Sequence, residues 1–285
     1  MADGAGGAPD SAAKGKQERL LSLLQATGGV VVAYSGGVDS TYLLAASLRA
    51  LGREGVLAVT AQSETYPASE LQEARELASR LGARHRIILT DELTDERFRR
   101  NPPDRCFFCK THLFEELWQV AREEGLPQVI YGATVDDLGD HRPGMRAAQE
   151  LGARAPLIEA GLTKIEVRML SRDLGLPTWD KPAMACLASR FPYHSSITGE
   201  GLRQVEQAED LLRRKIGLRQ VRVRHHGDVA RLEVEPADFG RLIEQRHSVV
   251  QGLKQLGYRY VALDLQGFRS GSMNEVLAAE GAARR

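Results

Sequence analysis

The stretch Val30-Val31-Val32-Ala33-Tyr34-Ser35-Gly36-Gly37-Val38-Asp39-Ser40 decides how the chain folds. Its first four residues are apolar and predict a buried strand, and Thr41–Ala46 reads as the start of a helix. Between the two, Gly36 and Gly37 permit positive φ and a close approach of the backbone to a ligand. A strand that turns directly into a helix points several backbone N–H groups and the helix dipole at one place. The turn therefore predicts a phosphate site, although a helix-capping turn without a ligand would have the same residues.

This turn does not have the Walker pattern GxxxxGKS/T, and it contains no lysine. Ser35–Ser40 instead resembles the PP-loop of ATP pyrophosphatases, which cut between the α- and β-phosphates to activate a carboxyl or carbonyl group as an adenylate. We expect Asp39 and Ser40 to cap the helix or to reach a metal ion, and Asp39 to position the Mg²⁺ that offsets the triphosphate charge. The residues that we expect to bind ATP are Ala33, Ser35, Gly36, Gly37, Val38, Asp39, Ser40, Thr60, Gly132 and Asp136.

The composition is that of an ordinary soluble protein. The 285 residues are 42% hydrophobic and 27% charged, which allows one or two domains with a sizeable core. No apolar run approaches the ~20 residues of a membrane span, and the start lacks a basic-then-apolar signal pattern. We therefore expect a cytoplasmic protein without a membrane partner. Residues 1–16 are rich in Gly, Ala and Ser, and we expect them to be disordered.

Strand and helix signals alternate through the first 180 residues. Thr163 and Glu166 fit a capping box, and Gly82 and Gly125 stand where helices would end. Repeated β-α units with short apolar strands predict an α/β fold with a doubly wound parallel sheet, whose ligands bind beyond the carboxyl ends of the strands. The predicted strands are Val30–Ala33, Val56–Thr60, Arg86–Leu89 and Val129–Tyr131, and the predicted helices lie near 40–51, 67–81, 111–124 and 163–175.

The pattern changes after Pro182. A predicted helix at 198–215 precedes a strand at Gln220–His225, in which Arg222 and Arg224 share one face. A hairpin then leads into a strand at Val229–Glu235, and a helix at 237–255 and a strand at Tyr258–Leu265 complete a smaller α+β domain. The predicted organisation is a tail over 1–16, an α/β domain over 17–182, an α+β domain over 183–270 and a second tail over 271–285.

Charge is distributed unevenly along the chain. Residues 1–180 carry 21 basic and 26 acidic side chains, whereas residues 181–285 carry 17 and 12. The excess in the second part includes a stretch without an acid that contains Arg213, Arg214, Lys215, Arg219, Arg222 and Arg224. This pattern indicates an anionic partner near the second part, although basic faces are often only solvated or form protein interfaces.

The three cysteines lie in two motif-like segments, Arg105–Lys110 with the pattern CxxC and Lys181–Arg190 around Cys186. Three cysteines are poor material for a disulfide framework. A zinc site would ordinarily need a fourth ligand, for which His112 or His85 are candidates. A redox pair would leave Cys186 without a role, whereas three thiolates can hold a 4Fe–4S cluster with one iron open. Three unrelated buried thiols are the remaining alternative.

Three segments together resemble the LarE family of ATP-dependent sulfur transferases. They are Ser35–Ser40, the segment that begins Ala185-Cys186-Leu187-Ala188-Ser189-Arg190-Phe191-Pro192-Tyr193 and continues to Thr198, and Tyr131–Asp137 with His141–Gly144. The similarity extends from about residue 18 to about residue 270. It implies a PP-loop ATP pyrophosphatase domain, and a small-molecule nucleotide substrate, pyridinium-3,5-biscarboxylic acid mononucleotide, whose carboxylates are adenylated and converted to thiocarboxylates for the nickel-pincer cofactor of lactate racemase.

The family has two branches that differ in the source of sulfur. In one branch the cysteine that matches Cys186 gives up its own sulfur and becomes dehydroalanine. In the other, two cysteines of a CxxC join it to bind a 4Fe–4S cluster that carries the transferred sulfide. Because this chain has Cys106 and Cys109, the resemblance implies the second branch, with Cys186 and Asp39 as catalytic residues.

The anionic substrate calls for guanidinium groups, which bind phosphates and carboxylates bidentately. We expect Arg190, Arg222 and Arg224 to bind it, with Ser189 as a further hydroxyl donor. Asp136, Asp137 and Asp140 follow a strand and are either acids of the ATP site or caps of a loop.

Three other functions compete with this prediction. A tRNA thiolase would need a larger basic surface than a chain of zero net charge offers. An ammonia-dependent synthetase of the GMP or NAD kind would not explain the cysteines, and only the loop favours a nucleotide-binding regulator. We therefore expect a homo-oligomer that acts on a small nucleotide and does not bind nucleic acid.

Overall fold

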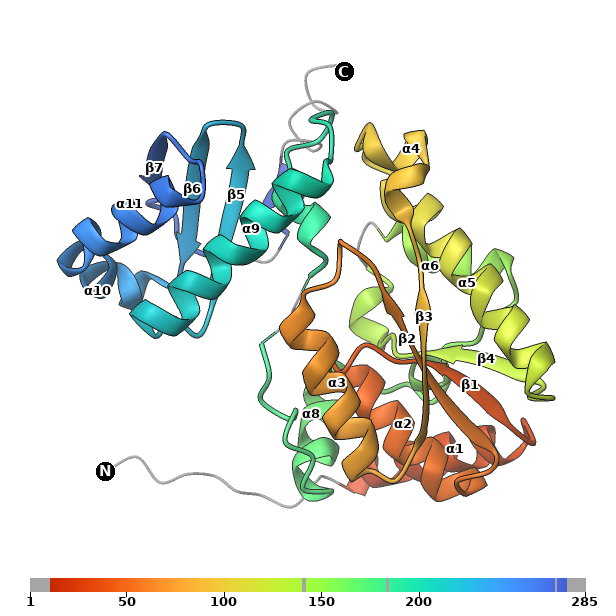
Figure 1. Cartoon of the computed structure of the whole chain (residues 1–285). Coiled ribbons are helices and arrows are strands. Elements are labelled where there is room, and N and C mark those ends of the chain that lie inside the picture. Colours follow the sequence, from red (N-terminus) through yellow and green to blue (C-terminus); the bar gives the residue numbers. More distant parts are fainter. Residues whose placement is uncertain (1–10, 140–141, 183–184, 270, 276–285) are drawn as a thin grey trace, which may run out of the picture. The chain divides into compact units, whose positions relative to one another are not determined.

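The structure is a computed structural model that describes residues 11–139, 142–182, 185–269 and 271–275. The chain forms two compact units, which Figure 1 colours along the sequence. The first unit contains the described residues of Met1–Ser63, Ala68–Thr90 and Cys106–Met184, and the second contains those of Glu64–Pro67, Asp91–Arg105 and Ala185–Arg285.

The first unit is built on a four-stranded parallel sheet with the strand order β3-β2-β1-β4. Its central strand, β1, pairs with β2 on one side and with β4 on the other, so that Val30 lies between Val56 and Gln128. The strand order reverses direction between β1 and β4, and doubly wound sheets bind ligands at such a point. The strands are β1 (Val30–Ala33), β2 (Val56–Gln62), β3 (Arg84–Leu89) and β4 (Gln128–Tyr131).

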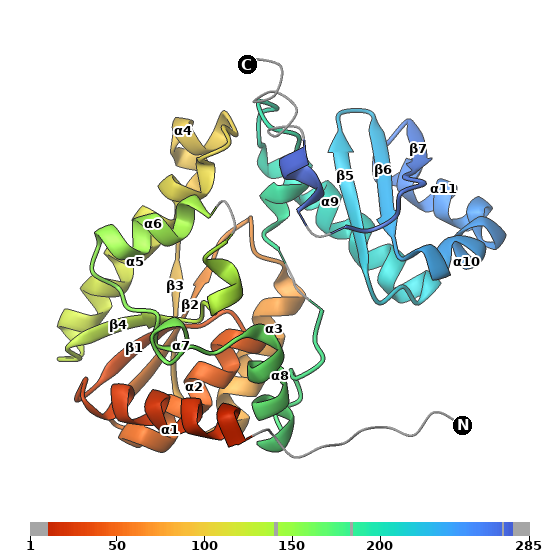
Figure 2. The ribbon, with the colours of Figure 1, turned by 180° about the vertical axis from the view of Figure 1, so that it is seen from behind.

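Helices cover both faces of this sheet, as the two opposite views show (Figures 1 and 2). Val30 and Val32 of β1 pack with residues of α1, α2, α3 and α8, whereas Val31 between them packs with residues of α5. This arrangement confirms the predicted doubly wound α/β fold. The helices are α1 (Ser11–Gln25), α2 (Val38–Leu51), α3 (Ala68–Arg80), α5 (Arg105–Glu123), α6 (Pro143–Glu150), α7 (Pro156–Glu159) and α8 (Lys164–Asp173).

The second unit is the smaller α+β part that the sequence predicted. Its sheet has the order β5-β6-β7, in which β5 and β6 are antiparallel and β7 is parallel to β6. One apolar core joins α9, the strands and the two following helices. The elements are β5 (Val221–His226), β6 (Val229–Val234), β7 (Tyr260–Leu263), α4 (Glu96–Arg99), α9 (Gly199–Leu211) with a π-helical turn at Leu212–Ile216, α10 (Phe239–Glu244) and α11 (Arg246–Gln255).

Several local predictions are confirmed. All four strands of the first unit form, although β2 extends to Gln62 and β3 begins at Arg84. The Thr163–Glu166 capping box is present at the start of α8. Gly82 and Gly125 have φ of +68° and +66°, the left-handed conformation that commonly ends a helix.

Other predicted boundaries are wrong. α5 begins at Arg105 rather than near residue 111, so the CxxC lies within its first two turns. The helix predicted at 237–255 divides at Gln245, which ends α10 and caps α11. The strand predicted from Tyr258 begins at Tyr260, because the Tyr258 amide donates to the Leu253 carbonyl and closes the end of α11.

The predicted disordered tail is wrong for Ser11–Lys16, which are helical. Packing stabilises this part of α1, since Ala13 is buried and the Lys16 ammonium lies 2.6 Å from a carboxylate oxygen of Glu166. Met1–Asp10 and most of the predicted second tail, 276–285, lie outside the described residues. The predicted domain boundary at 182/183 stays a prediction, and the second unit also includes Glu64–Pro67 and Asp91–Arg105.

No helix in the described parts of the chain combines the length and the apolar character that crossing a bilayer requires.

The end of β4 packs unusually close to the start of α2. A Cβ atom added to Gly132 would lie 2.8 Å from the Ser40 amide nitrogen and 2.9 Å from the Asp39 carbonyl carbon. Both neighbours are backbone atoms inside a helix, so they cannot move aside alone. Only glycine at position 132 allows β4 and α2 to approach in this way.

We predict that Gly132→Ala forces α2 away from β4 and lowers the free energy of unfolding by about 1–3 kcal/mol. Gly139→Ala is the matched control, because a Cβ at Gly139 would meet nothing within 4 Å. Urea unfolding of the two variants measures the difference. Equal stability of Gly132→Ala and Gly139→Ala would contradict the close approach.

Candidate functional site

The turn after β1 closes on itself through two serines. The Ser35 amide donates to Ser40 Oγ at 3.3 Å, and the two hydroxyl oxygens lie 3.2 Å apart. The Ser40 hydroxyl also contacts the Gly37 carbonyl at 3.2 Å. These contacts hold Ser35–Ser40 as one compact loop, with the Ser35 side chain exposed at its surface.

Helix α2 begins without a side-chain cap. Its N-cap residue is Gly37, which has no side chain that could accept from the first amides of the helix. The expectation that Asp39 or Ser40 caps the helix is therefore wrong, because both lie inside its first turn and the Ser40 hydroxyl is used within the loop. The amides at the start of α2 and the helix dipole are available to an anion.

Asp39 lies in this first turn with an unusual electrostatic environment. Burial raises its pKa to about 6, and the neighbouring Asp137 carboxylate acts in the same direction. Lys164, Arg168 and Arg142 oppose the shift without reversing it. At neutral pH the Asp39 carboxylate is thus ionised but poorly compensated, which suits a divalent cation.

The loop after β4 contains Asp137, the acid that acts on Asp39. Asp137 is buried, and its carboxylate accepts from the Thr134 amide in a capping box at the 3₁₀ turn Val135–Asp137. It also forms ion pairs with Arg142 and Lys164, each at 2.8 Å. Its neighbour Asp136 is exposed and accepts from the Lys164 amide at 2.8 Å.

Both aspartates therefore hold loops in place, which is the alternative that the sequence left open for them. Asp140 lies outside the described residues. A role of Asp136 in ATP binding stays a prediction.

Thr60 and His85 form a polar contact within the sheet. The Thr60 hydroxyl donates to the Tyr34 carbonyl at 2.8 Å and lies 2.9 Å from His85 Nε2. Thr60 is buried, so its hydroxyl joins β2 to the chain just before the loop. Val38 belongs to the loop and begins α2, and Ala33 ends β1 just before the loop. Gly132, directly after β4, lies against the backbone of Asp39 and Ser40.

The cysteines divide between the two units. Cys106 and Cys109 lie in α5 of the first unit, three residues apart and hence on one side of the helix. Cys186 lies in the second unit directly before the 3₁₀ turn Leu187–Arg190. Cys106 and Cys186 are exposed and Cys109 is partly exposed. The alternative of three unrelated buried thiols is therefore wrong. Within the described residues, no three Cys, His, Asp or Glu side chains form a group that could hold a metal ion.

Arg190 holds the backbone around Cys186. Its Nη1 donates to the carbonyls of Ala185 and Cys186 at 2.6 and 3.1 Å and contacts Ser189 Oγ at 3.0 Å. Its other edge binds both carboxylate oxygens of Glu209, at 2.8 and 3.0 Å, and both side chains are about 1% exposed. The guanidinium that the sequence assigned to the substrate is thus already engaged by the chain itself.

Glu209 was not among the predicted site residues, although its position in the helical pattern of α9 indicates burial. Leu202, Val205 and Ala208 form the buried stripe of α9, and Glu209 falls on the same stripe. An acid at a buried helical position requires a buried cation. Burial acts to raise the pKa of Glu209, but Arg190 and Arg213 outweigh it and lower the pKa.

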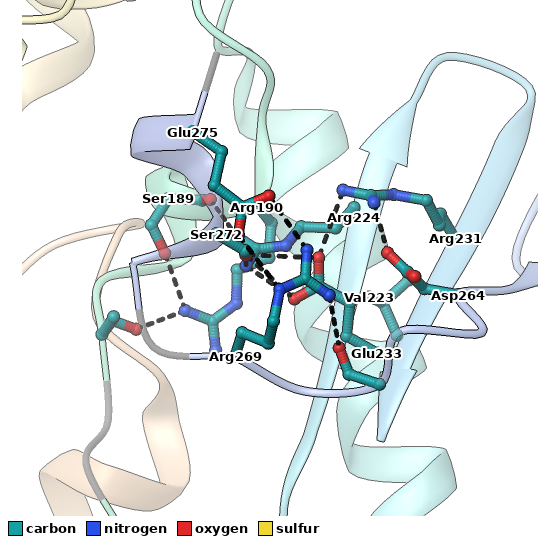
Figure 3. A network of polar contacts seen from close by, with 12 residues as sticks. Ser189, Arg190, Val223, Arg224, Arg231, Glu233, Asp264, Arg269, Ser272 and Glu275 are labelled. Carbon is teal, nitrogen blue, oxygen red and sulfur yellow. Dashed lines mark hydrogen bonds and ion pairs between the residues drawn. The ribbon is translucent and has the colours of Figure 1, made fainter. Parts of the chain in front are cut away.

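Arg224 is also buried within the protein's own polar network (Figure 3). Its Nη2 lies 2.7 Å from Glu233 and 2.8 Å from Ser272 Oγ, and its Nη1 donates to the Ser189 carbonyl at 2.7 Å. Glu233 is fully buried and also pairs with Arg231 at 3.2 Å.

Arg222 differs from both of these arginines. It is 8% exposed and stacks on the Phe268 ring at 4.7 Å, and it has no carboxylate within ion-pair distance among the described residues. Burial lowers its pKa to about 10, Arg190 and Arg224 add to this effect, and the charges of Glu209 and Glu233 oppose it. Of the three predicted substrate-binding arginines, it is the one without an ion pair among the described residues.

Comparison with known proteins gives matches over both parts of the chain. Residues 19–100 match the NAD synthase family. Over 262 residues the chain is 41% identical to the pyridinium-3,5-bisthiocarboxylic acid mononucleotide synthase of Lactiplantibacillus plantarum, covering 92% of this chain and 95% of that protein. An uncharacterized protein of Synechocystis sp. is 42% identical over 264 residues, 92% of this chain and 98% of that protein. The tRNA-specific 2-thiouridylase MnmA of Sphingopyxis alaskensis is 32% identical over 192 residues, covering only 54% of this chain and 49% of that protein.

We predict that Asp39→Asn stabilises the ligand-free protein above pH 6. The pKa of Asp39 rises from 3.8 to about 6 on folding, so its ionisation costs stability as pH rises through that window. The gain relative to the native protein is at most about 3 kcal/mol at pH 8 and disappears towards pH 4. Urea unfolding at the two pH values measures it. A gain that does not depend on pH would contradict the assignment.

We also predict that Arg190→Met lowers the free energy of unfolding by about 3–5 kcal/mol, because it leaves the Glu209 carboxylate buried with only Arg213 beside it. The double variant Arg190→Met/Glu209→Met should recover most of this loss, since apolar side chains can replace a buried pair. Arg214→Met breaks an exposed pair with Asp210 and serves as the control, with a change below about 0.5 kcal/mol. Additive losses in the double variant would exclude coupling.

Proposed function

Because the chain belongs to the LarE family of pyridinium-3,5-bisthiocarboxylic acid mononucleotide synthases, we propose that it is an ATP-dependent sulfurtransferase acting on pyridinium-3,5-biscarboxylic acid mononucleotide. The match over nearly the full length of both chains carries this proposal. The geometry supports it, since an uncapped helix start and a poorly compensated Asp39 lie together at the end of β1. The alternative of a tRNA thiolase is supported only by a match over about half of the chain.

In the proposed reaction, a substrate carboxylate attacks the α-phosphorus of ATP and pyrophosphate leaves. Sulfide then attacks the acyl-adenylate carbon, and AMP leaves with the electron pair of the broken C–O bond. The loop amides of Ser35–Ser40 and the start of α2 hold the departing phosphates. Asp39 would hold Mg²⁺, whose charge offsets that of the triphosphate.

The substrate carries several negative charges, and Arg222 is the group best suited to receive one. It is nearly buried, it has no ion pair among the described residues, and Phe268 holds its plane in place. Arg224 lies beside it on β5 with one edge already bound to Glu233. Arg190 and Ser189 act beside them by fixing the chain around Cys186, so their contribution to substrate binding is indirect.

We further propose that Cys106, Cys109 and Cys186 together hold a 4Fe–4S cluster. Three thiolates are the ligands that such a group takes, and two of the cysteines, Cys106 and Cys109, lie on one side of α5, which supports the proposal. When bound, the cluster supplies an open iron coordination position for sulfide. We expect the product to be used in the synthesis of a nickel-pincer nucleotide cofactor. We also expect the enzyme to be cytoplasmic and to form a homo-oligomer.

Anaerobically reconstituted protein should release AMP and pyrophosphate when it is given ATP, Mg²⁺ and pyridinium-3,5-biscarboxylic acid mononucleotide. It should turn over repeatedly when sulfide is also supplied. Cys106→Ala and Cys109→Ala should lose iron and multiple turnover, because each removes one of three cluster ligands. Iron analysis, product counting and mass spectrometry of the Cys186 peptide provide the measurements.

Retained single turnover in these variants with dehydroalanine at position 186 would show that Cys186 gives up its own sulfur instead. Release of ADP and orthophosphate would contradict the PP-loop reaction altogether. Thiolation of tRNA, with no reaction of the mononucleotide, would favour the tRNA thiolase.

A further inference from the structure

A lysine far from the loop in sequence contacts it in the folded chain. Lys181 lies after α8, and its ammonium nitrogen is 2.7 Å from Glu70 and 2.8 Å from Glu73, both in α3. The same nitrogen lies 3.5 Å from the Gly36 carbonyl oxygen, within the loop. The two carboxylate contacts are short and strong, whereas the carbonyl contact is long.

The environment keeps this lysine charged and in place. Its side chain is 15% exposed and that of Glu70 is 9% exposed. Burial acts to lower the pKa of Lys181, but the hydrogen bonds and charges of Glu70 and Glu73 outweigh it and raise the pKa. The backbone is held as well, because Arg168 of α8 donates to the carbonyls of Trp179 and Lys181 at 2.8 and 2.9 Å.

Helix α3, to which Lys181 is tied, is also the wall behind the loop. A Cβ on Gly36 would lie 3.0 Å from the Ala74 Cβ and 3.2 Å from its Cα. Ala74 follows Glu70 by one helical turn and Glu73 directly, so the residues that bind Lys181 adjoin the one that touches the loop. Moving α3 would therefore move the surface on which Gly36 rests.

The orientation of the Gly36 carbonyl determines the orientation of the Gly37 N–H, which belongs to the same peptide. Gly36 has φ of +64°, and a trans peptide points its C=O and the next N–H in opposite directions. A carbonyl held toward Lys181 therefore directs the Gly37 N–H away from it. Because two glycines in succession place little restraint on this peptide, a contact from outside the loop restrains it further than the serine contacts within the loop do.

We propose that Lys181 is a positioning residue for ATP: it holds the Gly36 carbonyl and α3 so that the loop amides keep the arrangement that receives the phosphates. This inference rests on the proposed use of ATP by the loop. Lys181 acts through the loop and is not a group that reacts.

The test compares Lys181→Met with Lys16→Met. The control removes a lysine that is 34% exposed and pairs with Glu166 at 2.6 Å, away from the loop. Calorimetry with ATP and Mg²⁺ should show about tenfold weaker binding for Lys181→Met, about 1.4 kcal/mol, and unchanged binding for Lys16→Met. The KM for ATP should rise without a matching rise in the KM for the mononucleotide, and Lys181→Arg should restore part of the ATP affinity.

Unchanged ATP affinity in Lys181→Met would overturn the inference, and so would an equal rise of both KM values, which indicates a general loss of stability. If Lys181→Met does not fold, Glu73→Gln decides, because it weakens the contact with Lys181 at an exposed side chain. A folded Glu73→Gln with native ATP affinity would overturn the inference, whereas weaker ATP binding would support it. Native protein that binds ATP but does not react with the mononucleotide would contradict the proposed function alone.

Discussion

The open start of α2, held within tightly packed backbone, is the constraint on which the first unit depends. Its N-cap is Gly37, which has no side chain that could accept from the first helix amides. Unpaired amides cost free energy unless a ligand or water satisfies them, and the protein leaves them available at the end of β1. The surroundings leave little room for change, because Gly36 rests on Ala74 and Gly132 rests on the backbone of Ser40. Preorganisation of this kind lets amides stabilise phosphate without rearranging.

The charges around this loop come from segments distant in sequence. Asp39 is in the loop, Asp137 follows β4, and Lys164 and Arg168 belong to α8. Asp137 lies close enough to raise the pKa of Asp39, while Lys164 and Arg142 form their ion pairs with Asp137. Asp39 is consequently left as the carboxylate with unmet charge, which gives it a reason to bind Mg²⁺ that its position in a motif alone does not provide.

In the second unit, arginines of similar sequence context have different physical roles. Arg190 is bound by Glu209 and by the carbonyls around Cys186, and Arg224 is bound by Glu233. Arg222 stacks on an aromatic ring, and Glu233, its cross-strand neighbour on β6, forms its ion pairs with Arg224 and Arg231 instead. A buried guanidinium with a carboxylate partner is already neutralised within the protein, whereas one without an ion pair is better suited to an anion from outside. The partner acids, and not the arginines, make this distinction.

The sequence by itself determined the parallel sheet, the turn at Ser35–Ser40 and the family, because these depend on local patterns: apolar strands, two adjacent glycines and a capping box at Thr163. It predicted the start of α5 poorly, since Arg105–Lys110 lacks the apolar periodicity that marks a helix. Only the tertiary structure decided that Lys181 reaches Gly36, that Glu209 binds Arg190 and that Arg222 keeps its charge. Each of these depends on which side chains meet across long stretches of chain, and burial and charge pairing act between elements that the local sequence does not relate.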